Sequence, residues 1–383
     1  MRKKVAVVLS TRPECGGEHQ YVSVLMECLI EIAGNDMELV AVCANRYWRK
    51  WCRNNQIRVL QCSWESLTEE EQKKMLRYPL FSRVRSMYMT KFGETLRKEK
   101  IDAVFVTTQG VFIPNLNIKV IVPVHDLMHR YEGTFPEVSN EYDARELMFA
   151  SKARYAWCVL TDSAVGKCQF MESYSNHMGR CLPHIVSLPF VVPDHIINCE
   201  EQPIEVPDKY IFYPAQFWKH KNHLNLIKAV EFLVEEIPDI HLILVGSEKN
   251  ALKEVKRYIS ENALENNVTI KGFVSNGNIT YLYQHAVGMV MPSYFGPTNI
   301  PPLEAMAMGC PVAVSNKYAM PEQVGDAGLL FNPDSPEEMA ACIKTMWLDE
   351  ALRQRMIRKG YDRTNRWTKK EFKEKLKKIL MHV

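Results

Sequence analysis

Residues 291–315 read MPSYFGPTNIPPLEAMAMGCPVAVS and decide the fold class. An apolar run ends at Ser293, a polar loop follows, and two prolines at 301 and 302 start a short helix. Proline at a helix start and glycine at its end are typical boundary signals, and Gly309 stops this helix before the next apolar run. The stretch therefore predicts a strand, a loop, a short helix and a second strand of a buried parallel sheet.

The same alternation extends in both directions along the chain. Short apolar runs without polar alternation indicate strands that are buried on both faces, and the stretches between them have helical periodicity. The predicted strands are Val5–Leu9, Leu39–Ala44, Ala103–Thr107, Val120–Val124, Cys158–Thr161, Tyr210–Tyr213, His241–Val245, Val268–Lys271, Gly288–Met291 and Pro311–Ser315. The predicted helices include Tyr21–Ala33, Arg145–Ala156, Pro336–Leu348, Glu350–Tyr361 and a basic helix at Lys369–Met381.

A poorly periodic, proline-bearing stretch at Pro189–Pro207 separates two such series. The pattern predicts two doubly wound, Rossmann-like α/β domains joined near residues 190–207. Loops after the carboxyl ends of the strands are then the expected binding sites.

Composition narrows the class of protein. The 383 residues suffice for two or three domains, and a net charge of +3 is far from the basic excess of a dedicated nucleic-acid binder. No run of about 20 apolar residues and no leader peptide is evident. The 11 cysteines form no C-x-x-C pair, which favours a reducing cytosolic compartment.

Two loops in the first half carry candidate functional residues. Gly16 and Gly17 follow the first strand and would allow an anion to approach a helix N-terminus, although a plain turn explains them equally well. No G-x-G-x-x-G motif is present, which weakens a dehydrogenase interpretation. His125 and Asp126 follow another strand and suit a catalytic role, whereas a metal pair with His129 lacks a third ligand at suitable spacing.

Two loops in the second half carry the others. Lys221, where a helix is expected to begin, is unfavourable there without an anion and so predicts a diphosphate site; a solvated basic turn is the alternative. Glu304 lies in the first turn of the short helix and could accept hydrogen bonds from sugar hydroxyls, or merely compensate the helix dipole. Because the prolines lack N–H groups, phosphate contacts there would come from the amides of Thr298, Asn299, Ile300 and Leu303.

With these residues in place, the chain resembles the retaining GT-B-fold glycosyltransferases of family four (glycosyl transferases group 1), over essentially its whole length. The sequence PPLEAMAMGCPV resembles that family's donor-site helix, Lys221-Asn222-His223 its diphosphate turn, Phe273 and Val274 its base-contacting loop, and His125 its histidine near the anomeric carbon. The resemblance implies an acceptor domain at 1–195, a nucleotide-sugar donor domain at 196–365 and a helix at 366–383 that returns to the first domain.

The resemblance also implies an activity. The chain would be a metal-independent hexosyltransferase without a cofactor, which moves a sugar from a nucleotide-diphosphate sugar to a glycan or lipid-linked acceptor in bacterial surface polysaccharide synthesis. Lys221 would stabilise the leaving diphosphate, Glu304 would hold the sugar, and His125 would orient the donor or stabilise positive charge.

Two positions depart from the family pattern. Gly296 stands where a first glutamate is usual, eight positions before Glu304, and Gln216 stands where an arginine is usual, five positions before Lys221. Thr298 and Asn299 are expected to contact the donor sugar instead. The alternatives are a partner subunit that binds the donor with reduced turnover, and an inverting transferase or epimerase on the same scaffold.

Residues 46–100 carry 14 basic and 6 acidic side chains, interleaved with aromatics. Basic and aromatic side chains together are typical of a surface that docks on an anionic membrane. Trp48 and Trp51 would then lie in the interface, or else pack in the core of the first domain. The protein is accordingly expected in the cytoplasm, peripherally at the inner face of the cytoplasmic membrane, and without a nucleic-acid partner.

Overall fold

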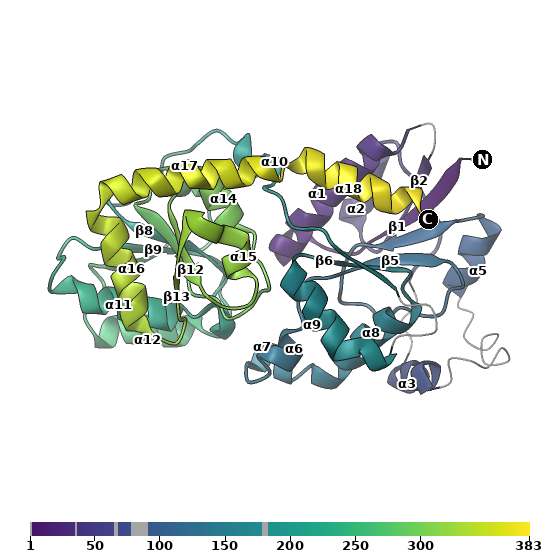
Figure 1. The fold of residues 1–383 in the computed structure, drawn as a ribbon, viewed down its shortest axis with the longest axis horizontal. Helices are drawn as coiled ribbons and strands as arrows, with labels where there is room; N and C mark the ends of the chain where they lie inside the picture. The colour runs from purple at the N-terminus through teal and green to yellow at the C-terminus, as the bar shows by residue number, and fades with distance from the viewer. Residues whose placement is uncertain (1, 35–36, 65–67, 78–90, 178–182) are drawn as a thin grey trace. The chain divides into compact units, whose positions relative to one another are not determined.

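A computed structural model describes residues 2–34, 37–64, 68–77, 91–177 and 183–383. The chain forms two compact units (Figure 1). The first comprises Met1–Gly133, Val138–Pro189 and Lys369–Val383, and the second comprises Thr134–Glu137 and Phe190–Thr368. The changes between units thus lie at Pro189 and Thr368, where the sequence suggested 195 and 365, and a short early segment joins the second unit.

A parallel sheet in the order β3-β2-β1-β4-β5-β6-β7 forms the centre of the first unit. Its strands are β1 (Lys3–Leu9), β2 (Met37–Cys43), β3 (Arg58–Val59), β4 (Ala103–Val106), β5 (Lys119–Val124), β6 (Cys158–Thr161) and β7 (His184–Ser187). Its helices are η1 (Pro13–Cys15), α1 (Gly17–Ile32), α2 (Arg46–Asn54), α3 (Glu69–Arg77), α5 (Lys91–Lys98), α6 (Met128–Tyr131), α7 (Pro136–Ser139, shared with the second unit), α8 (Tyr142–Tyr155), α9 (Ala164–Tyr174), η2 (Ser175–His177) and α18 (Lys369–Met381).

The second unit holds another parallel sheet, in the order β10-β9-β8-β11-β12-β13. Its strands are β8 (Ile211–Pro214), β9 (Leu242–Val245), β10 (Val268–Ile270), β11 (Gly288–Met291), β12 (Val312–Ser315) and β13 (Gly328–Phe331). Its helices are α10 (Asp194–Ile197), η3 (Lys219–Lys221), α11 (His223–Val234), α12 (Leu252–Glu261), α13 (Asn276–His285), α14 (Pro301–Ala307), α15 (Met320–Val324), η4 (Gly325–Ala327), α16 (Pro336–Leu348) and α17 (Glu350–Arg366).

The fold class expected from the sequence is confirmed: each unit is a parallel, Rossmann-like α/β domain. The apolar runs identified the strands correctly because these strands are buried on both faces. Val5–Leu9 and Leu242–Val245, for example, are buried along their whole length. Gly309, with φ of 72°, ends the segment of α14 in the left-handed conformation that glycine adopts without strain.

Three strands were not predicted. The edge strands β3, β7 and β13 have two to four residues, and most of their side chains are partly exposed. Exposure rather than length explains why they were missed, because central strands of four residues such as Gly288–Met291 are buried throughout and were predicted. The helix expected at Glu350–Tyr361 is also longer, because α17 continues to Arg366.

Trp48 corrects part of the membrane interpretation. Its side chain is fully buried, and its indole N–H donates to the Thr11 carbonyl oxygen at 2.8 Å. Trp48 is therefore a core residue of the first unit and offers nothing to an interface, while Trp51 is only partly buried. The basic and aromatic residues expected at 81–88 lie outside the described residues.

The C-terminal helix α18 packs on α1 within the first unit. Phe372 and Leu376 are buried, and Lys369 and Lys373 form ion pairs with Glu27 at 2.7 Å and Glu31 at 2.5 Å. The exposed ion pairs contribute little, so apolar burial holds this helix.

We expect L376A to destabilise the first unit by about 2–5 kcal/mol, because it opens a cavity at a fully buried position. The exposed neighbour provides the control, since K377A removes no packing. Urea titration followed by hydrogen exchange of β1 measures the effect. Equal stability of the two variants would show that α18 is not part of this core.

Candidate active site

The sheet order of the second unit places two loops side by side. β8 pairs with β9 on one side and with β11 on the other. The order in which successive strands join the sheet therefore reverses between β8 and β11. The loops that follow β8 and β11 start at this switch point, which is the usual place for a ligand in an open parallel sheet. Most of the predicted donor-site residues lie on these loops or on α14.

Lys221 links the two loops. Its ammonium Nζ lies 3.1 Å from Asn299 Oδ1 and 3.5 Å from Ser293 Oγ. Lys221 was expected to open a helix, but it is the last residue of the turn η3, and α11 begins at His223. Asn222, at φ of 60°, separates the two elements, and a left-handed residue of this kind gives no periodic signal in the sequence.

Asn299 is held firmly within the loop after β11. Its side-chain amide Nδ2 donates to the Phe295 carbonyl at 2.9 Å, and its backbone N–H donates to Gln323 Oε1 at 3.1 Å. A Cβ atom at Gly296 would lie 3.2 Å from the Thr298 nitrogen and 3.9 Å from Asn299 Nδ2. Asn299 and Thr298 therefore border the space into which a side chain at position 296 would project.

Two of the four amides expected to contact a phosphate are already engaged. The Asn299 N–H bonds Gln323, as described, and the Leu303 N–H donates to the Ile300 carbonyl oxygen at 2.9 Å. The sequence could not show this, because Gln323 lies 24 residues further along the chain.

Glu304 lies in the first turn of α14 and is only 5% exposed. The hydroxyl of Tyr283, on α13, donates to its Oε2 atom at 2.9 Å. Tyr283 was missed by the sequence analysis, because nothing in a helical pattern distinguishes a tyrosine that holds a carboxylate from an ordinary core tyrosine.

The remaining predicted donor residues lie at the edges of this region. Gln216 Oε1 accepts a hydrogen bond from the Trp218 indole at 3.0 Å. In the loop after β10, the Phe273 ring is 89% exposed and Val274 is partly buried. An aromatic ring left this exposed is available for stacking on a planar ligand.

The first unit has its own switch point, between β1 and β4. Gly16 is the N-cap of α1 at φ of 62°, and Gly17 is the first residue of that helix. The Thr108 hydroxyl, after β4, donates to Glu18 Oε1 at 2.5 Å and so connects the two loops. Burial raises the pKa of Glu18, against the lowering effect of this hydrogen bond.

His125 follows β5 and is mostly buried. Its ring packs edge-on against Tyr21, with centroids 4.6 Å apart, and its backbone N–H donates to Gln109 Oε1 at 2.7 Å. Burial lowers the pKa of His125 to about 4, and the neighbouring charge of Asp126 only partly offsets this. The imidazole is consequently neutral at pH 7.

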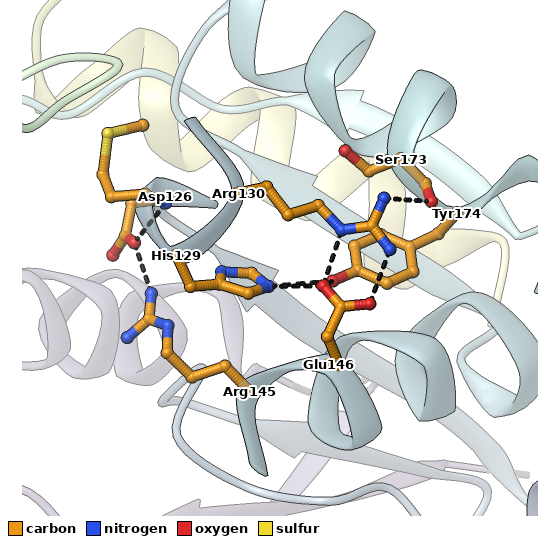
Figure 2. A network of polar contacts seen from close by, with 8 residues as sticks. Asp126, His129, Arg130, Arg145, Glu146, Ser173 and Tyr174 are labelled. Atoms are coloured by element: carbon orange, nitrogen blue, oxygen red, sulfur yellow. Dashed lines mark hydrogen bonds and ion pairs between the residues drawn. The ribbon is translucent and has the colours of Figure 1, made fainter. Parts of the chain in front are cut away.

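Asp126 is fixed by several donors (Figure 2). It accepts hydrogen bonds from Arg145, from Gln109 Nε2 at 2.6 Å and from the backbone N–H of Met128 at 3.1 Å. These bonds fix the chain that directly follows His125.

His129 belongs to a separate structural network. In Figure 2 its Nε2 atom points to Glu146 Oε1, at 2.9 Å, which also accepts from the Tyr174 hydroxyl at 2.9 Å. Arg130 forms a two-pronged ion pair with the same carboxylate, at 2.6 and 2.5 Å. Burial and the nearby Arg145 lower the pKa of His129 to about 4. Over residues 2–34, 37–64, 68–77, 91–177 and 183–383, no three histidine, cysteine or acidic side chains gather as metal ligands would.

The second unit is similar to glycosyl transferases of group 1. Residues 197–363, within the second unit, match the family model "Glycosyl transferases group 1". The chain is 28% identical over 152 residues to O-antigen chain mannosyltransferase B of Escherichia coli and 26% identical over 203 residues to O-antigen chain mannosyltransferase RfbU of Salmonella typhimurium. These alignments cover 39% and 48% of this chain, and 40% and 56% of the two relatives, so the chain spans about half the length of the relatives that it matches.

Solved structures agree on the fold. The chain is 17% identical to a glycosyltransferase from Rickettsia africae, with a TM-score of 0.71 over 99% of this chain and 97% of that one. It is 18% identical to Anabaena Alr3699/HepE in complex with UDP and glucose, with a TM-score of 0.71 over the whole of both chains. At this identity the likeness concerns the GT-B fold alone.

The neutral His125 predicts a pH dependence of stability. An unfolded histidine has a pKa near 6.5 and therefore binds a proton between pH 6.5 and 4 that the folded His125 does not. The free energy of unfolding should fall as the pH is lowered through this interval, by up to about 1.4 kcal/mol per pH unit for this one proton.

In H125Q this contribution disappears, so the slope of stability against pH should become shallower by that amount. Urea titrations at half-unit steps between pH 4 and 7.5 measure it. An unchanged slope would contradict burial of a neutral imidazole.

Proposed function

We propose that this chain is a retaining, metal-independent hexosyltransferase of family four, which transfers a sugar from a nucleotide-diphosphate sugar to a hydroxyl of a glycan or lipid-linked acceptor. The observation that carries the proposal is the placement of Lys221 against Asn299 and Ser293 at the switch point of the unit that matches the family model. The names of the two mannosyltransferase relatives support a hexose and a role in bacterial surface polysaccharide synthesis.

Lys221 is the proposed contact for the diphosphate. Two of its hydrogen-bonding partners, Asn299 Oδ1 and Ser293 Oγ, are neutral oxygens, and these contacts hold the ammonium between the two loops. A diphosphate at this position would form charge-assisted hydrogen bonds, which are stronger than neutral ones. As the bond from the sugar to the phosphate breaks, the same charge stabilises the leaving group.

Glu304, Thr298 and Asn299 are the proposed contacts for the sugar. The Tyr283 hydroxyl fixes one oxygen of Glu304 and so sets the direction of the carboxylate. Thr298 and Asn299, beside Gly296, supply a hydroxyl and an amide where the family pattern has a carboxylate. Phe273 is proposed to stack on the nucleotide base.

The proposed reaction retains the configuration at the anomeric carbon. The acceptor oxygen forms its bond to that carbon on the face from which the phosphate leaves, and the acceptor proton passes to the departing phosphate oxygen. No protein base is required for this transfer, which agrees with a pKa of about 4 for His125. Its neutral ring would orient the sugar or stabilise the positive charge that develops there.

K221A should weaken binding of a nucleoside diphosphate by about ten- to a hundredfold, because a lost charge-assisted hydrogen bond is worth about 1.5–3 kcal/mol. Titration calorimetry with UDP and with GDP measures the effect and also identifies the base. K253A removes an exposed lysine of α12 and serves as the control. Equal affinities of K221A and K253A would refute the role of Lys221.

We also propose that the first unit docks on an anionic membrane through α2, which would bring a lipid-linked acceptor to the protein. Arg46, Lys50 and Arg53 are exposed on this helix, and Tyr47 is 42% exposed. Each basic side chain near such a surface contributes about 1 kcal/mol. No helix among the described residues is long and apolar enough to cross a membrane. Association at the inner face of the cytoplasmic membrane would then be peripheral.

Sedimentation with vesicles tests this docking. We expect binding to vesicles that contain anionic lipid, its loss in 1 M salt, and a clear reduction in the variant K50E/R53E, because the attraction is electrostatic. Neutral vesicles are the control. If the protein binds neither kind of vesicle, docking through α2 is refuted and a soluble acceptor becomes the better hypothesis.

A further inference from the structure

The segment Thr134–Glu137 is an unexpected part of the second unit. It comes from the first half of the sequence, yet its contacts are with the loops after β8 and β11. We call these four residues the clamp segment.

Glu137 attaches the clamp segment to the turn η3. Its Oε1 atom accepts a hydrogen bond from the backbone N–H of Lys219 at 2.8 Å, and it lies 3.5 Å from the backbone nitrogen and 3.3 Å from the ring Nδ1 of His220. The Glu137 side chain is 7% exposed. Burial acts to raise the pKa of Glu137, but hydrogen bonds from His220 and its other neighbours outweigh it and lower the pKa to about 2. The carboxylate is therefore ionised throughout the physiological range.

Phe135 attaches the clamp segment to the loop after β11. Its ring centroid lies 5.1 Å from that of Tyr294 and 5.6 Å from that of Phe295. Phe295 in turn stacks on His220, with centroids 3.8 Å apart and an angle of 11° between the rings. Glu137 and Phe135 thus both contact one group of aromatic rings that spans both loops.

The two loops so joined are those that carry Lys221 and Asn299. The Tyr294 backbone N–H donates to the His220 carbonyl oxygen at 2.9 Å, and the Phe295 carbonyl accepts from Asn299 Nδ2 at 2.9 Å. Lys221 directly follows His220 in η3. A shift of η3 relative to the β11 loop would consequently separate Lys221 from Asn299.

We propose that Glu137 is a positioning residue for the diphosphate site: its carboxylate fixes η3 so that Lys221 is placed before the ligand arrives. This inference rests on the proposed function. The reason is that a buried, ionised acceptor on two successive backbone N–H groups restrains the turn more strongly than a neutral side chain would. Preorganisation of this kind is expressed as affinity, because less motion is lost on binding.

The variant E137Q tests the proposal, since it keeps the size of the side chain and removes the charge. We expect it to weaken binding of UDP or GDP about tenfold and to raise the KM for the sugar donor more than it lowers kcat. The melting temperature should stay close to that of the wild type. E141Q changes an exposed glutamate four residues away and is the matched control.

A double-mutant cycle shows whether Glu137 acts through Lys221. In the K221A background, E137Q should cause little further loss, because the group that it positions is already absent. The same loss in both backgrounds, or affinities equal to those of E141Q, would overturn the proposal.

Hydrogen exchange of the Lys219–Lys221 peptide distinguishes failure of the positioning role of Glu137 from failure of the proposed function. The amides of η3 should exchange faster in E137Q than in E141Q, whatever the ligand is. If the wild type binds neither nucleoside diphosphate, the proposed function fails, and the role of Glu137 in donor binding fails with it, even where exchange shows a restrained turn. If the wild type binds and E137Q exchanges like E141Q, only the role of Glu137 is refuted.

Discussion

The pairing of β8 with β11 is the constraint on which the candidate site depends. β8 and β11 are neighbours in the sheet, and β9 lies on the other side of β8. The chain therefore leaves β8 and β11 in opposite directions across the sheet, and the loops after these two strands lie side by side. Residues separated by 78 positions, Lys221 and Asn299, thereby come within hydrogen-bonding distance. The strands themselves are apolar and buried, so the sheet supplies a rigid support while the loops supply the chemistry.

The first unit repeats this arrangement with different side chains. At its switch point between β1 and β4, the Thr108 hydroxyl donates to the Glu18 carboxyl group, and Arg12 is the basic residue on the loop after β1. Burial favours the neutral forms of both Glu18 and His125. Under the proposed function, these neutral groups would face an acceptor hydroxyl, while the diphosphate would bind the second unit.

The sequence predicted features that depend on local patterns and missed those that depend on distant contacts. The buried strands and the start of α14 at Pro301 could be predicted, because apolar runs and prolines influence the structure of the same residues in which they occur. Glu137 gave no signal, since its partners lie 82 and 83 residues away. For Trp48 the sequence left a membrane surface and the core of the first domain as alternatives, and the core is the one observed: helical periodicity turns its side chain inward while Arg49 and Lys50 face solvent.

Gly296 and Gln216 replace a carboxylate and a guanidinium of the family pattern, so both substitutions change the charge near Lys221. A carboxylate at 296 would project toward Asn299, whose Oδ1 atom accepts from Lys221, and would attract that ammonium directly. Asn299 instead binds it through a neutral oxygen, and Gln216 contributes no second cation. Relative to the family pattern, one negative and one positive group are both missing, so the net charge of the loops is unaltered, and no carboxylate at position 296 competes with a diphosphate for Lys221. If Lys221 binds the diphosphate as proposed, its position depends on the aromatic rings and the buried Glu137 carboxylate that contact η3.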